Sequence, residues 1–161
     1  SYYLTCDRVN GVLTVYTDST MRIPIKTIRV SVGKAGTETP TGTWTMHRAG
    51  RWQELMGPSW GQYGTHVVNG IFVHSVACGQ ANSYNLPVGE YLRLGNPASH
   101  GCIRACVADA KWVWDNCNGS KIHIFDGTYT SNEALKGPLG RKALTPLRGS
   151  KNFDPTDPAC K

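Results

Sequence analysis

The chain has 161 residues, 40% of them hydrophobic and 17% charged, a composition typical of a globular domain. This length buries a sizeable core without disulfides, and no apolar run approaches the about 18 residues that span a membrane. The net charge of +6 suits anionic cell-wall polymers or a merely solubilising basic surface. Lys and Arg are scattered along the chain rather than clustered, which argues against a nucleic-acid-binding module. We therefore expect one domain over residues 1–161.

The amino-terminal part of the chain is predicted to be β structure. Residues 11–16 and 27–32 alternate apolar and polar side chains at period two, which is typical of strands with one buried face. Asn10-Gly11 and residues 18–20 are turn signals, and a further strand is expected over residues 22–26. The pattern predicts hairpins at this end of the chain.

Two loop regions follow. Residues 39–42, Thr-Pro-Thr-Gly, form a predicted turn before a strand over residues 43–46, because proline presets φ and glycine accepts positive φ. Residues 48–65 combine glycines with tryptophan and tyrosine, which is too broken for a helix and too aromatic for a linker. We interpret this stretch as the wall of a groove, with the alternative that its rings simply cap the sheet.

Residues 70–75 form a predicted apolar strand that places His74 at the rim of a sheet. A histidine at a strand end is usually structural, so the pattern alone leaves its role open. The excursion over residues 76–98 is interpreted as a lid over the groove, with a small helical piece over residues 91–94.

The clearest chemistry lies in Ser99-His100-Gly101-Cys102-Ile103-Arg104. A thiol reacts as thiolate, so it needs a base or a positive charge that lowers its pKa from about 8.5, and His100, Arg104 and a more distant histidine supply both. Gly101 has no Cβ, so its N–H and that of Cys102 can face a developing oxyanion. We interpret Cys102 as the nucleophile of an acyl-transfer site.

A helix is predicted over residues 107–116, because apolar residues recur at helical spacing up to an Asn118-Gly119 stop. If it begins just after Cys102, its dipole favours the thiolate. Residues 121–125 alternate again and are expected to close the sheet. Residues 127–161 are rich in Gly, Pro and Thr and are expected to form an irregular tail over the domain, or else a disordered linker end.

The nucleophile stretch, preceded by Phe72-Val73-His74-Ser75, resembles the L,D-transpeptidase (YkuD-type) catalytic domain. Residues 30–34 and 39–43 resemble the family's upstream strand and turn, and residues 109–112 its helix after the nucleophile. The likeness covers roughly residues 9–126, the expected core of the domain. It implies a mainly β fold of β-sandwich-like mixed sheets, with one main helix after the nucleophile and the 39–42 turn at the border of the active-site groove.

The resemblance also implies how the catalytic work is divided. His74 takes the proton of the Cys102 thiol as general base and returns one as general acid. Ser75 orients His74 through its backbone or hydroxyl.

The loop before the nucleophile receives supporting roles. Backbone N–H groups at His100 and Gly101 help to hold the oxyanion. Arg104 binds a substrate carboxylate through its planar fork, or forms a structural ion pair that orders the loop. Ser99 lies at the substrate, although it and His100 are better suited to shaping the loop than to moving protons.

The resemblance also implies the substrate and the reaction. Enzymes of this family act on peptidoglycan tetrapeptide stems, form a cysteine thioester and release D-Ala. An amine of a second stem then gives a 3→3 cross-link, whereas water gives an L,D-carboxypeptidase, and the sequence leaves both open. No cofactor or metal is implied, and carbapenem-type β-lactams are expected inhibitors. The expected location is outside the cytoplasm at the bacterial cell wall, with secretion or anchoring by a segment upstream of Ser1.

Six cysteines favour an oxidising compartment. With Cys102 free as nucleophile, at most two disulfides form among the other five. The expected pairs are Cys6 with Cys78 and Cys117 with Cys160. The alternative, in which Cys106 and the other four are small buried hydrophobes, stays open.

Two rival functions use the same residues. His74, His100, Cys102 and Cys106 offer the ligand types of a tetrahedral zinc centre, although Gly101 alone separates two of them. A catalytically silent wall-binding module is the other rival. A papain-like hydrolase is disfavoured, because it places cysteine before histidine in the chain.

Overall fold

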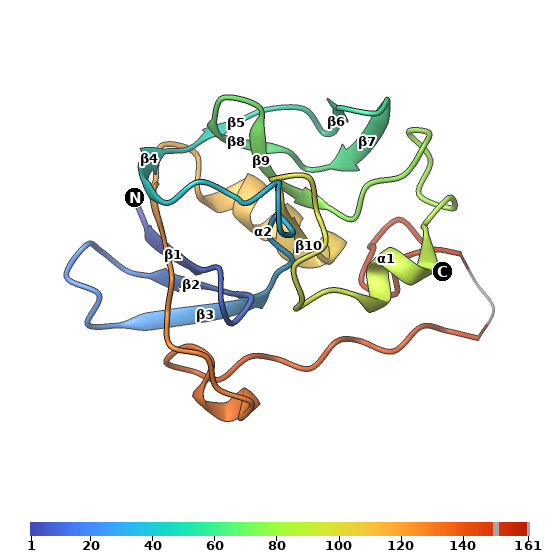
Figure 1. Cartoon of the computed structure of the whole chain (residues 1–161). Helices are drawn as coiled ribbons and strands as arrows, with labels where there is room; N and C mark the ends of the chain where they lie inside the picture. Colours follow the sequence, from blue (N-terminus) through green and yellow to red (C-terminus); the bar gives the residue numbers. More distant parts are fainter. Residues whose placement is uncertain (150–151, 161) are drawn as a thin grey trace.

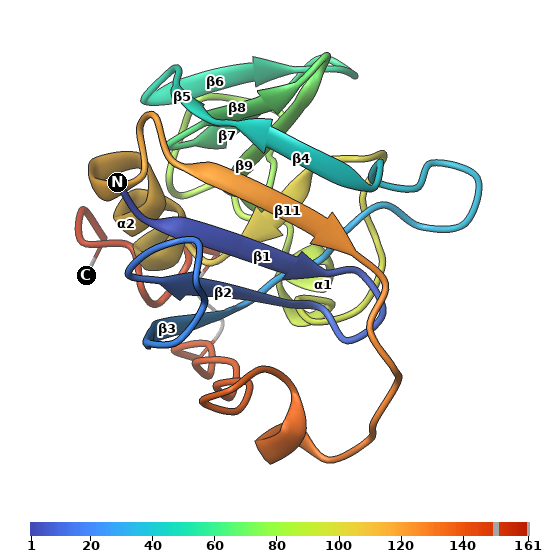
Figure 2. The same cartoon turned by 90° about the vertical axis from the view of Figure 1, so that its left-hand side faces the viewer.

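The computed structural model describes residues 1–149 and 152–160 and contains two main sheets (Figure 1). The first has five strands in the order β3-β2-β1-β11-β4, with β1 and β11 parallel and the other pairs antiparallel. Figure 2 shows it face on. Its strands are β1 (Tyr3–Asp7), β2 (Val12–Tyr16), β3 (Pro24–Arg29), β4 (Gly42–Thr45) and β11 (Lys121–Phe125).

The second sheet has four strands in the order β10-β9-β8-β5. They are β5 (His47–Arg48), β8 (Thr65–Val68), β9 (Ile71–Ser75) and β10 (Ile103–Ala105). A separate hairpin of β6 (Trp52–Leu55) and β7 (Ser59–Gln62) pairs only within itself among the named strands. The parallel pair of β9 and β10 sets His74 opposite Arg104.

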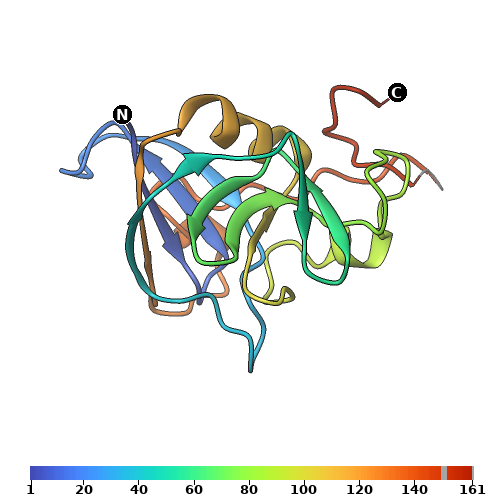
Figure 3. The ribbon, with the colours of Figure 1, turned by 90° about the horizontal axis from the view of Figure 1, so that it is seen from above.

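The core lies between the two sheets and helix α2 (Val107–Asn116). Figure 3 shows α2 lying alongside both sheets. Its inward residues are Val107, Ala110 and Val113, which recur at helical spacing. The other helical pieces are α1 (Val88–Leu92) and a 3-10 turn, η1 (Glu133–Leu135). Within residues 1–149 and 152–160, no helix has the length and apolar character needed to cross a bilayer.

The predicted mainly β class with one main helix is confirmed, and the bounds of α2 and β11 agree with the predicted ones. The strands expected over residues 22–26 and 27–32 are instead one strand, β3. Strand β1 was not predicted, yet it pairs with both β2 and β11 and so lies in the middle of its sheet. The fold therefore begins before residue 9, the expected start of the core.

In its described part, the tail beyond residue 126 packs on the domain as a largely irregular segment. Figures 1 and 2 show it passing beneath β3. Leu144 and Leu147 pack against a buried cluster of Val76, Tyr91 and Leu94. Phe153 is buried as well, so the linker alternative does not hold for this part of the tail.

The tail also caps α2. The N-cap residue Cys106 makes no side-chain cap bond. Instead Asp154 Oδ2 accepts the N–H of Val107 at 2.8 Å, and Thr156 Oγ1 accepts that of Ala108 at 3.1 Å. Two of the helix's free N–H groups are thereby satisfied by residues far along the chain.

Asp154→Ala is expected to lower the free energy of unfolding by about 1–2 kcal/mol, because it removes this cap. Asp154→Asn keeps an oxygen for the Val107 N–H and is expected to lose less. Chemical denaturation of the two variants and the parent chain measures the difference. Equal midpoints for Asp154→Ala and the parent would show that the tail does not stabilise α2.

Candidate active site

Residues 99–102, the nucleophile loop, are held in shape by hydrogen bonds between their own polar groups. Ser99 Oγ donates to the carbonyl of Cys102 at 2.5 Å and accepts the N–H of Gly101 at 3.1 Å. Gly101 has φ +133°, and a Cβ there would lie 2.9 Å from Ile71 Cδ1. This position therefore requires glycine.

The prediction that the 39–42 turn borders the active-site groove is wrong, because none of its residues lines the cavity that contains Cys102. Thr39 is fully buried and lies behind the nucleophile loop. Its hydroxyl donates to the carbonyl of Gly101 at 2.6 Å and accepts the N–H of Gly33 at 2.9 Å. The turn thus braces the loop from behind.

The Cys102 thiol lies against the start of β9. Its Sγ accepts the Phe72 N–H at 3.4 Å and lies 3.5 Å from the carbonyl of Gly70, to which the thiol donates. Burial raises the pKa of Cys102, while the Phe72 N–H and the charge of Arg104 lower it in part. The thiol is therefore mainly protonated at neutral pH and needs a base to become reactive.

The expected help from a helix dipole is absent. Strand β10 lies between Cys102 and α2, so the helix does not begin just after the nucleophile. Dipole effects act within the first turn of a helix, and this thiol lies outside that turn.

His74 is 2% exposed and its Nδ1 is bonded to the carbonyl of Ser75. A carbonyl only accepts, so Nδ1 carries the proton and Nε2 keeps its lone pair. Burial lowers the pKa of His74 to about 4, assisted by the charge of Arg104 and opposed by the Ser75 bond. The imidazole is therefore neutral at pH 7 and able to accept a proton.

His74 and Cys102 line one cavity of about 310 Å³. The pairing of β9 with β10 brings them together, because it places the residue just before β10 beside the start of β9. The cavity combines apolar walls with a few convergent polar groups, which is typical of binding sites. Its lining consists of Leu55, Met56, Ser59, Gly70, Ile71, His74, Ala77, Ser99, His100, Cys102 and Arg104.

Arg104 lies at the edge of this cavity and forms the ion pair that was the alternative reading of its sequence position. Its Nη1 lies 2.9 Å from Glu90 Oε2 on α1. The Arg104 side chain is mostly buried, so this pair fixes its guanidinium in place. It still faces the cavity and retains donors beyond the one that Glu90 takes.

The remaining groups of the nucleophile loop differ in whether their hydrogen-bonding capacity is already used. Ser99 is buried and its hydroxyl is used within the loop, so it shapes the loop. The Gly101 N–H is taken by Ser99, which removes it as an oxyanion donor in this conformation. Within the described part of the chain, the N–H groups of His100 and Cys102 have no partner. They are the donors left for an oxyanion.

The cavity wall comes from the hairpin of β6 and β7, which agrees with the groove wall predicted over residues 48–65. Leu55, Met56 and Ser59 line the cavity from its tip, and Met56 is 83% exposed. The predicted lid over residues 76–98 is wrong, since that segment contributes only Ala77 to the lining. Its apolar residues pack instead against the tail leucines, and its helical piece is α1.

Strand β7 also backs His74. A Cβ at Gly61 would lie 2.6 Å from His74 Nδ1 and 2.9 Å from its Cγ. Only a residue without a side chain lets β7 approach the imidazole this closely. The sequence alone does not point to Gly61, because a glycine in an aromatic loop carries no signal of its neighbour in space.

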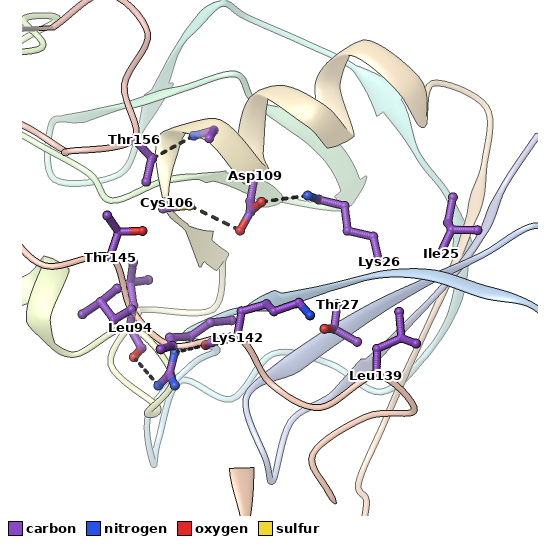
Figure 4. A pocket seen from close by; sticks show the side chains of 14 residues that line it. Ile25, Lys26, Thr27, Leu94, Cys106, Asp109, Leu139, Lys142, Thr145 and Thr156 are labelled. Carbon is purple, nitrogen blue, oxygen red and sulfur yellow. Dashed lines mark hydrogen bonds and ion pairs between the residues drawn. The ribbon is translucent and has the colours of Figure 1, made fainter. Parts of the chain in front are cut away.

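Cys106 lies elsewhere, on a separate cavity of about 400 Å³ between β3, α2 and the tail (Figure 4). Its Sγ donates to Asp109 Oδ2 at 3.3 Å, and Lys26 lies 3.2 Å from the other carboxylate oxygen. The zinc alternative therefore loses a ligand. Within residues 1–149 and 152–160, no three His, Cys, Asp or Glu side chains are grouped as metal ligands.

The expected disulfides are contradicted, because all six cysteines are free thiols. Cys6 and Cys117 are fully buried in the main core, where burial raises the pKa of each to about 12. Cys78 lies outside that core, with its Sγ 2.9 Å from the carbonyl of Gln80. The small-hydrophobe alternative describes Cys6 and Cys117 well.

Fold and site together define an enzyme-like domain, in which mixed sheets present a thiol and a neutral imidazole to one cavity. The family model of the L,D-transpeptidase catalytic domain, YkuD, matches residues 1–134. The chain belongs to this family.

Individual relatives are more distant. YciB of Bacillus subtilis (strain 168), provisionally assigned as an L,D-transpeptidase, is 59% identical over 27 residues, which are 17% of this chain and 14% of that protein. A fused Zn-dependent amidase/peptidase/peptidoglycan-binding protein from Clostridium acetobutylicum ATCC 824 superposes with a TM-score of 0.59 at 23% identity, over 77% of this chain and 51% of its own. The L,D-transpeptidase LdtMt1 in complex with imipenem gives 0.59 at 21%, over 77% and 58%. The chain thus spans little more than half of these solved structures.

The buried His74 is expected to make the domain acid-sensitive. Its pKa is about 4 when folded and 6.5 in the reference state, so the unfolded chain binds the extra proton between these values. Stability is then lost as the pH falls from about 6.5 to about 4, by about 3 kcal/mol from this group.

His74→Asn removes the titrating ring, so its loss of unfolding free energy between pH 7 and pH 4 is expected to be about 3 kcal/mol smaller than that of the parent chain. Urea denaturation at both pH values measures it. Identical pH dependence in the two proteins would contradict a buried neutral His74.

Gly61→Ala is expected to displace the imidazole, because its methyl group overlaps the ring, and overpacking of this kind costs about 1–3 kcal/mol. The rate of acylation of Cys102 by a carbapenem, followed by mass spectrometry, should fall at least about tenfold. Gly79→Ala is the matched control, since nothing lies within 4 Å of a Cβ there. Equal rates for both variants would refute the contact.

Proposed function

We propose that this chain is the catalytic domain of a peptidoglycan L,D-transpeptidase that acts through a thioester on Cys102. The observation that carries the proposal is the shared cavity of Cys102 and His74, in a chain of this family. The substrate is a tetrapeptide stem, cleaved after the L-centre of its third residue. The whole of residues 1–161 is proposed to form this one domain, acting outside the cytoplasm at the bacterial cell wall.

The raised pKa of Cys102 and the lowered pKa of His74 indicate a neutral pair rather than a preformed thiolate and imidazolium. His74 Nε2 takes the thiol proton as Sγ attacks the stem carbonyl. The N–H groups of His100 and Cys102 stabilise the oxyanion. The intermediate then expels the amine of D-Ala, which receives the proton from His74, and a thioester remains.

The thioester is resolved by a second nucleophile. The side-chain amine of a diamino acid on another stem attacks the acyl carbon and gives its proton to His74. The C–S bond breaks, the Cys102 sulfur regains a proton, and a 3→3 cross-link is released. Water in place of the amine gives a tripeptide, the outcome of an L,D-carboxypeptidase.

Ser75 and Arg104 support this chemistry. The Ser75 carbonyl fixes the Nδ1–H tautomer, so that Nε2 is the basic atom. Arg104 is proposed to attract the substrate's carboxylate while Glu90 holds its guanidinium. Anionic wall polymers are proposed to be attracted by the net charge of +6.

Incubation with a carbapenem is expected to add one drug molecule to the intact protein, because attack on the β-lactam carbonyl opens the ring without a leaving group. LdtMt1, which shares the fold, has been solved in complex with imipenem. Cys102→Ala should lose the adduct, while His74→Asn should slow its formation by about 10²–10⁴. Intact-mass spectrometry over time measures both.

Cys106→Ala is the matched control, since that thiol lies on the other cavity, and it should keep the adduct. An adduct that survives Cys102→Ala would overturn the assignment of the nucleophile. Disaccharide-tetrapeptide is the next substrate, with cross-linked dimer supporting the transpeptidase and tripeptide alone supporting the carboxypeptidase.

A further inference from the structure

The hairpin of β6 and β7 is joined to the rest of the domain at a limited number of points. Its strands pair with each other, backbone hydrogen bonds over residues 49–51 and 63–64 continue its ladder towards β5 and β8, and a bridge joins Trp60 to Cys78. A two-stranded hairpin by itself is marginally stable in water. The position of this hairpin, which walls the cavity and backs His74, therefore depends on these attachments and on the side chains packed at the end of β7.

One of those contacts is the side chain of Gln62, the last residue of β7. It is 4% exposed, and its Nε2 donates to Asp157 Oδ2 at 3.0 Å. Its Oε1 accepts from Arg51 Nη1 at 2.8 Å. The amide thus lies between a guanidinium and a carboxylate, in the orientation that satisfies both of its ends.

Asp157 belongs to the tail, beyond the residues 1–134 that the family model matches. It is 3% exposed, and it accepts the Ala159 N–H at 2.9 Å and the Cys160 thiol in addition to Gln62. Burying a carboxylate is costly unless hydrogen bonds compensate for the lost water. Loss of the hydrogen bond between Gln62 and Asp157 would remove a partner from a buried amide N–H and from a buried carboxylate oxygen, so breaking it is costly.

The backbone of Gln62 leads directly to the catalytic histidine. Its N–H donates to Ser75 Oγ at 2.8 Å, and the Ser75 carbonyl holds His74 Nδ1. The preceding residue, Gly61, lies against the imidazole ring. A shift of this end of β7 therefore changes both the support of Ser75 and the space available to His74.

We propose that Asp157 is a positioning residue for His74, acting through Gln62, so that the tail completes the active site. The role of His74 as base rests on the proposed function, whereas its placement by Asp157 does not. Asp157 touches no reacting group. It fixes the end of β7, and β7 fixes the ring.

The test is Asp157→Ala, read by the imidazole signals of His74 in long-range ¹H–¹⁵N NMR spectra. The parent chain should show a single Nδ1–H tautomer, and the variant should show exchange between tautomers or ring positions. Carbapenem acylation of Cys102 should slow about tenfold to a hundredfold, as small misplacements of catalytic groups do. Gln62→Met should reproduce both effects, and the double variant should be no worse than either single one.

Leu144→Ala is the matched control, because it weakens the packing of the tail without touching Gln62. It should lower stability and leave the His74 tautomer unchanged. If Asp157→Ala fails to fold, Gln62→Met carries the test from the other partner. A parent-like His74 spectrum in the folded Asp157→Ala or Gln62→Met protein overturns the inference. Absence of acylation in the parent refutes the proposed function, while the spectra still decide the placement of His74.

Discussion

The site depends on the parallel pairing of β9 with β10. This register sets Arg104 opposite His74 and brings Cys102, which precedes β10, beside the start of β9. Parallel neighbours require a long crossover, and residues 76–102 supply it. Residues 76–98, the predicted lid, thus form most of the connection that makes this parallel pair possible, and they pack beside the site rather than over it. A slip of one residue would turn His74 or its partner to the other face.

Burial then decides the chemistry of the pair. The same removal of water that lowers the pKa of His74 raises that of Cys102, since both charged forms lose hydration. Neutral thiol and neutral imidazole are therefore the resting forms, and in the proposed mechanism the charges arise during attack on a carbonyl. Arg104 acts in both directions, because its charge disfavours an imidazolium and favours a thiolate. Its ion pair with Glu90 keeps that charge at the edge of the cavity.

Two segments with few backbone pairings to the main sheets lie near this pair, and specific side-chain contacts hold each of them in place. The hairpin of β6 and β7 provides the wall of the cavity, and the tail holds that hairpin at Gln62 and caps α2 with Asp154. Asp154 and Asp157 lie outside the region matched by the family model, yet they reach two elements inside that region, β7 and α2. This arrangement explains why an irregular segment carries buried carboxylates. Each one satisfies donors of the domain that would otherwise lack a partner.

The sequence by itself determined the elements with a strong local period, α2 and β11, and it pointed to Cys102 and His74, which line one cavity, because the Ser-His-Gly-Cys stretch and the His-Ser strand end are local patterns. It failed where the deciding contact is distant. Strand β1 takes its central place by pairing with β11 across the whole domain, and the supposed lid packs against tail leucines. Gly61 and Gln62 carry no local sign that they meet His74 and Asp157. Only the tertiary structure decided these contacts, because burial and side-chain packing join residues that no periodicity relates.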